Sequence, residues 1–286
     1  MSFKQYIHRH KLYSVGLALG GGGALGLAHV GVLKALEEFD VRPKIISGNS
    51  AGALVGGLYA SGKSVDELID LSQEMGDDMF DHFKMSLRGG LVNAKRIHEK
   101  LLDILGDVHI EDAPIPFIAV SVDLISGKTF YIHRGRLADA IRASISVPGV
   151  FRPYHTNGLQ LVDGGVRDSV PLRALDNYSL KLRIAVVLMK ASLQDEPPAL
   201  LDITPEEKKE EEKEKDSPGI LKVISRSMAI SSTESAFREI RAGKPDLSIY
   251  IDLGDKMKMW DFKRHEMAIK TGYEQAFTQL NTFFGK

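Results

Sequence analysis

Gly48-Asn49-Ser50-Ala51-Gly52 is a G-x-S-x-G sequence that stands between a short apolar stretch at 45–47 and a helical pattern of small residues at 53–60. Strand, sharp turn and helix in this order are the context in which the motif presents a serine nucleophile. The two glycines allow a tight bend, which would expose the Ser50 hydroxyl beside the first amides of the helix. The segment therefore predicts a serine hydrolase acting by acyl transfer, although small-residue turns between a helix and a sheet can share the pattern.

A glycine-rich loop, Gly20-Gly21-Gly22-Gly23, precedes this elbow, between a predicted strand at 15–19 and a helical pattern at 27–38. Such a loop exposes backbone N–H groups at the positive end of a helix and binds anions. Residues 21–26 also fit G-x-G-x-x-G, but Asp40 precedes the second strand instead of closing it, which weakens a dinucleotide site. The loop therefore favours an oxyanion hole, in which one donor can be worth about 10²–10³ in rate.

A third motif, Asp163-Gly164-Gly165, follows a strand pattern at 159–162. A carboxylate at a strand end, followed by two glycines, is held on a turn with open space around it. Taken alone, the motif is typical of an ordinary Asp-Gly turn.

Together with the block Ala143-Ser144-Ile145-Ser146-Val147-Pro148-Gly149-Val150-Phe151, these motifs resemble the patatin-like phospholipase family, including bacterial and archaeal esterases and the neuropathy target esterase catalytic domain. The resemblance covers residues 15–190 well. It implies a dyad in which Ser50 is the nucleophile and Asp163 the proton acceptor. It also implies an oxyanion hole formed by the backbone amides of Gly21, Gly22, Gly23 and Ala51, and motif glycines at Gly26, Gly48, Gly52, Gly164 and Gly165.

Two positions depart from the family pattern. Leu25 stands where the family usually has Arg or Lys, which removes a cation that could hold the loop. Asn49 stands where Thr or Gly is common, and we treat that change as minor.

A histidine-containing triad is disfavoured. In the order Ser, Asp, His it needs a histidine after the acid, and His265 alone follows Asp163, in a polar stretch that predicts a surface residue. A lone aspartate, with an ordinary pKa of about 3.9, can take the serine proton only in a partly dry site. We therefore expect Asp163 to lie under a closed or lipid-filled cleft.

Composition indicates a globular enzyme. The chain has 286 residues, 43% of them apolar, with no cysteine and a net charge of −1. We expect neither disulfides nor a cysteine metal site, no metal or cofactor, and no nucleic-acid partner. Without a signal-peptide pattern or an apolar run of about 20 residues, the chain is expected to be cytoplasmic, with transient contact at a membrane surface. Apolar residues at 79–85 and 257–262 could edge a lipid cleft or be ordinary core-edge residues.

Strand and helix patterns alternate along the chain, which predicts a three-layer α/β/α sandwich around a mainly parallel sheet, with the site at the carboxyl ends of the strands. We expect an N-terminal arm at 1–14 and a single catalytic domain at 15–286, with a charged insert or lid at about 197–218. The expected strands are 15–19, 44–47, 117–123, 128–132, 159–162, 183–189 and 247–251. The expected helices are 27–38, 51–61, 64–75, 94–105, 136–145 and 171–177.

The sequence thus predicts a lipid acyl hydrolase of the phospholipase A, lysophospholipase or carboxylesterase type, acting on phospholipids, lysophospholipids or other fatty-acyl esters. A transacylase using the same dyad, a non-catalytic adaptor with the same fold and a nucleotide-binding enzyme remain alternatives.

Overall fold

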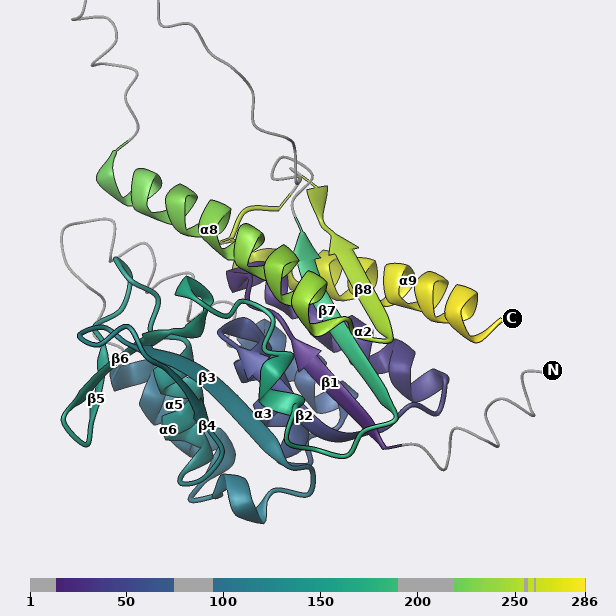
Figure 1. The fold of residues 1–286 in the computed structure, drawn as a ribbon, viewed down its shortest axis with the longest axis horizontal. Coiled ribbons are helices and arrows are strands. Elements are labelled where there is room, and N and C mark those ends of the chain that lie inside the picture. Colours follow the sequence, from purple (N-terminus) through teal and green to yellow (C-terminus); the bar gives the residue numbers. More distant parts are fainter. Residues whose placement is uncertain (1–13, 75–94, 190–218, 255–256, 260, 286) are drawn as a thin grey trace, which may run out of the picture.

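The computed structural model describes residues 14–74, 95–189, 219–254, 257–259 and 261–285. An eight-stranded sheet forms its centre (Figure 1). Its strands are β1 (Val15–Leu19), β2 (Pro43–Asn49), β3 (Phe117–Asp123), β4 (Thr129–Ile132), β5 (Tyr154–Thr156), β6 (Leu159–Asp163), β7 (Leu182–Met189) and β8 (Leu247–Asp252). The order is β5-β6-β3-β2-β1-β7-β8, and β4 also pairs with β3. Strands β3, β2, β1, β7 and β8 run parallel, whereas β4 and β6 run antiparallel to β3.

Helices cover both faces of the sheet. They are α2 (Ala28–Glu38), α3 (Ala51–Ala60), α5 (Lys95–Leu105), α6 (Leu137–Ser144), α8 (Ile220–Gly243) and α9 (His265–Phe284), with short 3-10 turns that include η1 (Gly23–Leu27), η3 (Gly164–Val166) and η4 (Arg173–Leu175). Residues 65–74 are also helical. In Figure 1, α8 crosses the front of the sheet, and α2 and α3 lie behind it.

The core is divided by the alternation of side chains along each strand. In β1, Leu17 and Leu19 belong to the larger apolar cluster, which includes residues of α2, α3, α6 and α9, whereas Ala18 belongs to a smaller cluster that includes Ala236 of α8. In β2, Ile46 belongs to the larger cluster and Ile45 to the smaller one. The sheet is therefore buried on both faces, as a three-layer sandwich requires.

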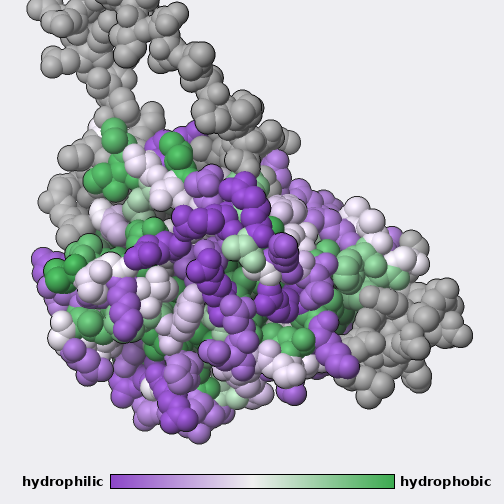
Figure 2. Space-filling view, viewed as in Figure 1, coloured by the Kyte–Doolittle hydropathy of each residue, from purple (hydrophilic) through white to green (hydrophobic). Residues whose placement is uncertain are grey.

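Figure 2 shows the face that carries α8. Hydrophobic side chains are exposed along the N-terminal half of this helix, where Val223 and Ile230 are 46% and 51% exposed. Its C-terminal half presents charged residues, among them Arg238 and Arg241.

The predicted sandwich with a mainly parallel sheet is confirmed, and every predicted strand is present. The predicted helix at 171–177 is wrong, and only η4 forms there. The Pro171 carbonyl accepts a hydrogen bond from the Ser47 hydroxyl at 2.8 Å, and the Leu175 amide donates to the Leu172 carbonyl at 3.0 Å, the spacing of a 3-10 turn. The short strand β5 was not predicted. The strand β6, which ends at Asp163, is antiparallel to β3. Ser50 therefore follows the carboxyl end of a parallel strand, as predicted, whereas Asp163 does not.

Several predictions lie outside the described residues, namely most of the arm at 1–14, the apolar residues at 79–85 and all of the charged insert at 197–218. Across the described helices, none is both long and apolar enough to cross a membrane.

Candidate active site

The turn at Ser50 joins β2 directly to α3. Its backbone angles are φ 52° and ψ −120°, so a non-glycine residue occupies a conformation that costs energy and is typical of functional turns. The flanking glycines are needed for close approach. A Cβ atom on Gly48 would lie 2.5 Å from the Gly52 carbonyl oxygen, and one on Gly52 would lie 2.2 Å from that of Leu19. The sequence therefore forms the bend that the G-x-S-x-G pattern predicts.

A second serine fixes this turn from the neighbouring helix. The Ser50 amide donates a hydrogen bond to the Ser144 hydroxyl oxygen at 2.9 Å, and the Ser144 hydroxyl donates to the Val120 carbonyl at 2.7 Å. Ser144 is fully buried at the end of α6. It thus connects the elbow to the central strand β3, a role that the sequence analysis missed although Ser144 lies in a block quoted for the family resemblance.

In the glycine-rich loop, some backbone amides donate hydrogen bonds to main-chain carbonyls and others do not. The Gly20 amide donates to the Val186 carbonyl and the Gly21 amide to the Ser169 carbonyl, both at 3.0 Å. In the described part of the chain, the amides of Gly22 and Gly23 have no main-chain acceptor. At the start of α3, the Ala51 amide also has no acceptor within its own helix. Of the four predicted donors, Gly21 is thus the one already engaged by the fold.

A buried histidine supports the same loop. His29 is inaccessible to solvent, and its Nε2 lies 2.8 Å from the Gly20 carbonyl oxygen. Burial lowers the pKa of His29 to about 4, so the ring is neutral and must carry its proton on Nε2 to donate this bond. His29 is therefore a packed structural residue and holds the strand end from which the loop begins.

Asp163 ends β6 and is 4% exposed. The Gly165 amide donates to its Oδ1 at 2.8 Å, and its own amide donates to the Ser146 carbonyl at 3.0 Å. Burial raises the pKa of Asp163 to about 6, and hydrogen bonding from the Ser50 hydroxyl and the Gly165 amide limits this rise. The ionised carboxylate therefore has a basicity suited to accept a proton near neutral pH.

The sheet brings the two predicted residues together across one strand. Asn49 is paired with Val120 of β3, and the next residue of β3, Ser121, is paired with Asp163 of β6. The Ser50 hydroxyl lies close enough to the carboxylate to lower the pKa of Asp163. The groups that shift the pKa of Asp163 include no histidine, and His265 lies at the start of α9.

Asn49 lies beside this pair and is fully buried. Its amide is enclosed by three glycines, because a Cβ atom on Gly21 or Gly165 would lie 2.7 Å or 3.1 Å from Nδ2, and one on Gly164 would lie 2.6 Å from Oδ1. Among the described residues, neither polar atom has a partner within strict hydrogen-bond geometry, yet the amide is close enough to lower the pKa of Asp163. The sequence signal for this contact was the position of Asn49 directly before Ser50. From the sequence alone, Asn49 counts only as a minor departure from the family pattern.

An apolar groove adjoins the loop. It is lined by Gly21, Gly22 and Leu25, by the end of β7, by one face of α8 and by Met259. Leu25 is 4% exposed, so the residue that departs from the family pattern forms part of an apolar wall. Of the stretch at 257–262, Met257 and Phe262 are buried in the core, whereas Met259 covers the loop, where its carbonyl accepts from the Ala24 amide at 2.7 Å.

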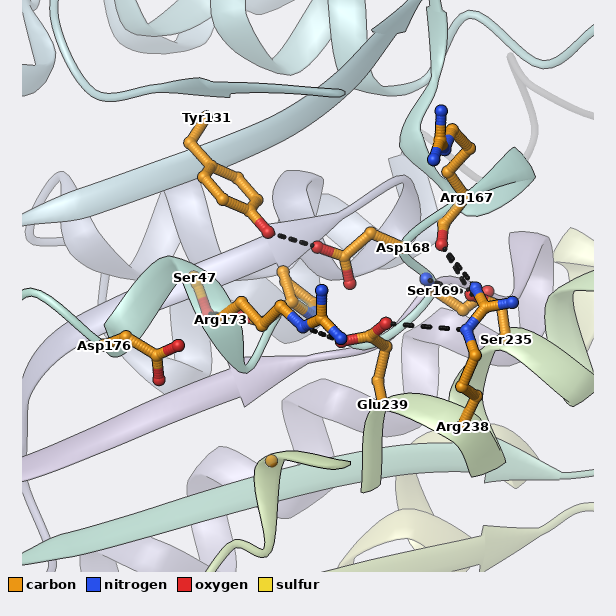
Figure 3. A network of polar contacts seen from close by, with 12 residues as sticks. Ser47, Tyr131, Arg167, Asp168, Ser169, Arg173, Asp176, Ser235, Arg238 and Glu239 are labelled. Carbon is orange, nitrogen blue, oxygen red and sulfur yellow. Dashed lines mark hydrogen bonds and ion pairs between the residues drawn. The ribbon is translucent and has the colours of Figure 1, made fainter. Parts of the chain in front are cut away.

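A polar network fastens α8 to the segment that follows Asp163 (Figure 3). The Tyr131 hydroxyl donates to buried Asp168 at 2.8 Å, and burial raises the pKa of Asp168 to about 6. Buried Glu239 of α8 forms an ion pair with Arg173 at 3.2 Å. The Ser235 hydroxyl donates to the Arg167 carbonyl at 2.9 Å. These contacts join segments far apart in sequence, and no local pattern predicted them.

Within the described ranges, no group of three or more His, Cys, Asp or Glu side chains could hold a metal ion.

Comparisons with known proteins show which family and fold the chain resembles. Residues 17–176 match the family model described as patatin-like phospholipase. An uncharacterized NTE family protein of Mycobacterium tuberculosis is 41% identical over 188 residues, which cover 61% of this chain and 49% of that protein. The lysophospholipase NTE1 of Cryptococcus neoformans is 33% identical over 189 residues, which cover 64% of this chain and 12% of that protein. The chain thus spans half or less of the length of these relatives.

One solved structure has a similar fold. VipD from Legionella pneumophila aligns over 94% of this chain and 67% of its own, with a TM-score of 0.52 and 14% sequence identity. At this identity the likeness concerns the fold alone.

Proposed function

The chain belongs to the patatin-like phospholipase family, and from that premise we propose that it is a serine-dependent lipid acyl hydrolase that cleaves fatty-acyl esters of phospholipids or lysophospholipids. The observation that carries the proposal is the contact between Ser50, in its left-handed turn, and the buried carboxylate of Asp163. A relative named as a lysophospholipase supports the substrate class.

In the first half of the proposed reaction, the Ser50 Oγ atom attacks the ester carbonyl carbon while Asp163 takes the hydroxyl proton. The carbonyl oxygen becomes an oxyanion and is held by the free amides of Gly22 and Gly23, with that of Ala51 beside them. The tetrahedral intermediate then collapses: the bond to the alcohol breaks, and the alcohol oxygen receives the proton from Asp163.

In the second half, water attacks the acyl-serine ester and gives its proton to Asp163. Collapse releases the fatty acid and returns the proton to the Ser50 oxygen. Because Asp163 has a pKa of about 6, it is largely ionised at neutral pH and can accept both protons without a histidine.

A fluorophosphonate probe tests this proposal, because its adduct with serine resembles the tetrahedral intermediate. We expect the wild-type protein to be labelled at Ser50, and labelling to be lost in Ser50→Ala and strongly slowed in Asp163→Asn. Release of fatty acid from a lysophospholipid should depend on the same two residues.

Circular dichroism of each variant controls for folding, and Ser61→Ala, at the far end of α3, is a matched serine control that should label normally. Folded wild-type protein that does not react, or labelling that survives in Ser50→Ala, would contradict the proposal.

A further inference from the structure

The groove beside the glycine-rich loop has a cavity volume of about 50 Å³ and is partly open to solvent. Its floor is the end of β7, with Val187 and Leu188, and one wall is α8. Small side chains of α8 face it over two turns, with Ala229 at one end and Ala236 at the other. Because these positions are seven residues apart, they lie on the same side of the helix.

The groove and the proposed reaction centre share the glycine-rich loop. A Cβ atom on Gly21 would lie 3.4 Å from Ser50 Cβ, and one on the next residue, Gly22, would lie 2.6 Å from Leu188 Cδ1. Both glycines line the groove, and Gly21 also lies against the nucleophile. On the other side, Ser232 of α8 lines the groove and its Oγ atom lies 3.5 Å from a Cβ atom built on Gly165, two residues after Asp163.

The lining favours hydrocarbon over a charged head group. Leu25, Val170, Leu188, Phe237 and Met259 supply apolar surface, and three hydroxyl side chains, Ser169, Ser232 and Thr233, supply its polar side-chain atoms. Among the described residues that line it, none is charged. Among these described lining residues a phosphate group would find no cation, whereas a methylene chain would lose contact with water along the groove.

We propose that this groove binds the acyl chain of the ester, so that the Gly22 backbone separates the oxyanion from the hydrocarbon; this inference rests on the proposed function of Ser50. Because each buried methylene contributes about 0.8 kcal/mol, or about fourfold in rate constant, acylation should accelerate with chain length until the groove is filled.

Alkylphosphonofluoridates with methyl, butyl and octyl chains on phosphorus test this inference. In each case the Ser50 oxygen forms a bond to phosphorus, the phosphorus–fluorine bond breaks and fluoride leaves, while Asp163 receives the serine proton. For wild type we expect the rate constant of Ser50 labelling with the octyl probe to exceed that with the methyl probe by at least about 50-fold, consistent with several buried methylenes.

Ala229→Phe fills the groove and should reduce the octyl-to-methyl ratio at least about tenfold, the equivalent of roughly two methylenes. The ratio cancels any general loss of reactivity. Ser231→Phe places the same ring on the exposed side of the helix, two residues away, and should keep the wild-type ratio. Thr233→Phe, which also lines the groove, is the second variant if Ala229→Phe does not fold.

Equal rates for the methyl and octyl probes on wild type would overturn the inference and leave the proposed nucleophile intact. A ratio that survives in the groove-filling variant would also overturn it, as would chain-length dependence that appears only when the alkyl chain is carried on the alkoxy oxygen. Absence of labelling by every probe would instead contradict the proposed function itself.

Discussion

The main-chain amide of Ser50 donates a hydrogen bond to the side-chain oxygen of Ser144, 2.9 Å away, so that the strained turn is held from a helix 94 residues further along the chain. The Ser144 hydroxyl is in turn anchored on the Val120 carbonyl of the central strand. The conformation of the proposed nucleophile is thus determined by β3 and α6 as well as by its own glycines.

Replacing Ser144 with alanine should destabilise the fold and slow labelling. The change removes the hydrogen bond to the Val120 carbonyl and leaves the buried Ser50 amide without its side-chain acceptor, which costs about 1–3 kcal/mol. Thermal unfolding and the rate of fluorophosphonate labelling measure the two effects. Ser61→Ala removes a hydroxyl bonded to the Leu58 carbonyl at the other end of α3 and should change stability only. Equal labelling rates in the two variants would refute the role of Ser144.

Replacing Asn49 with alanine should move the pH dependence of labelling to higher pH. The Asn49 amide lowers the pKa of Asp163, so its loss favours the protonated acid, and the rise in rate that we expect near pH 6 in wild type should occur at higher pH. Ser47→Ala changes another buried residue of β2 whose hydroxyl bonds to the Pro171 carbonyl, and it should leave the pH profile in place. An unshifted profile in Asn49→Ala would show that Asn49 merely fills space.

Asp163→Asn should stabilise the protein at neutral pH while it removes activity. The pKa of Asp163 is about 6 in the folded protein against an ordinary 3.8, so folding favours the protonated carboxyl. The stability that this provides is present in acid and is lost as the pH rises through about 6, a difference of about 3 kcal/mol. The variant avoids this loss, so its melting temperature should exceed that of wild type at pH 8. The difference in melting temperature should be smaller at pH 4.

Asp123→Asn is a matched control for which we expect the opposite change in stability at pH 8. Hydrogen bonds from Ser126 and from the Gln160 amide lower the pKa of Asp123 to about 2. Its contribution to stability is therefore present above the ordinary pKa and is lost in acid, so this variant should be less stable than wild type at pH 8. If both substitutions lower the melting temperature equally at pH 8, burial of Asp163 does not govern its ionisation.

Gly26→Ala should disturb the loop by steric contact, and a second change should restore it. A Cβ atom on Gly26 would lie 2.1 Å from Ala51 Cβ but 3.4 Å from Ala51 Cα, so Ala51→Gly removes the clash. We expect slow labelling in Gly26→Ala and recovery in the double variant, with a coupling free energy of about 1–3 kcal/mol between neighbouring sites. Additive effects in the double-mutant cycle would rule out this contact.

The sequence predicted the elements near the site well because their patterns are local. The elbow, the glycine loop and the strand ending at Asp163 each follow from a few consecutive residues. The direction of β6 did not, because pairing with β3 depends on segments about 40 residues apart and on the unpredicted strand β5. The engagement of the Gly21 amide by Ser169 and the enclosure of Asn49 by three glycines depend likewise on long-range contacts. The roles of Ser50 and Asp163 stay predictions that labelling tests.

The position of β3 between Ser50 and Asp163 has a consequence for how such a protein can change. The spacing of the two residues is set by ladder hydrogen bonds across β2, β3 and β6, with neighbouring strands about 4.8 Å apart. The groove, by contrast, takes its width from α8, which rests on one outer face of that sheet. Substitutions on α8 can therefore change which molecules fit the groove while the sheet keeps Ser50 and Asp163 at the same spacing. Substrate selectivity and catalytic chemistry can thus evolve independently.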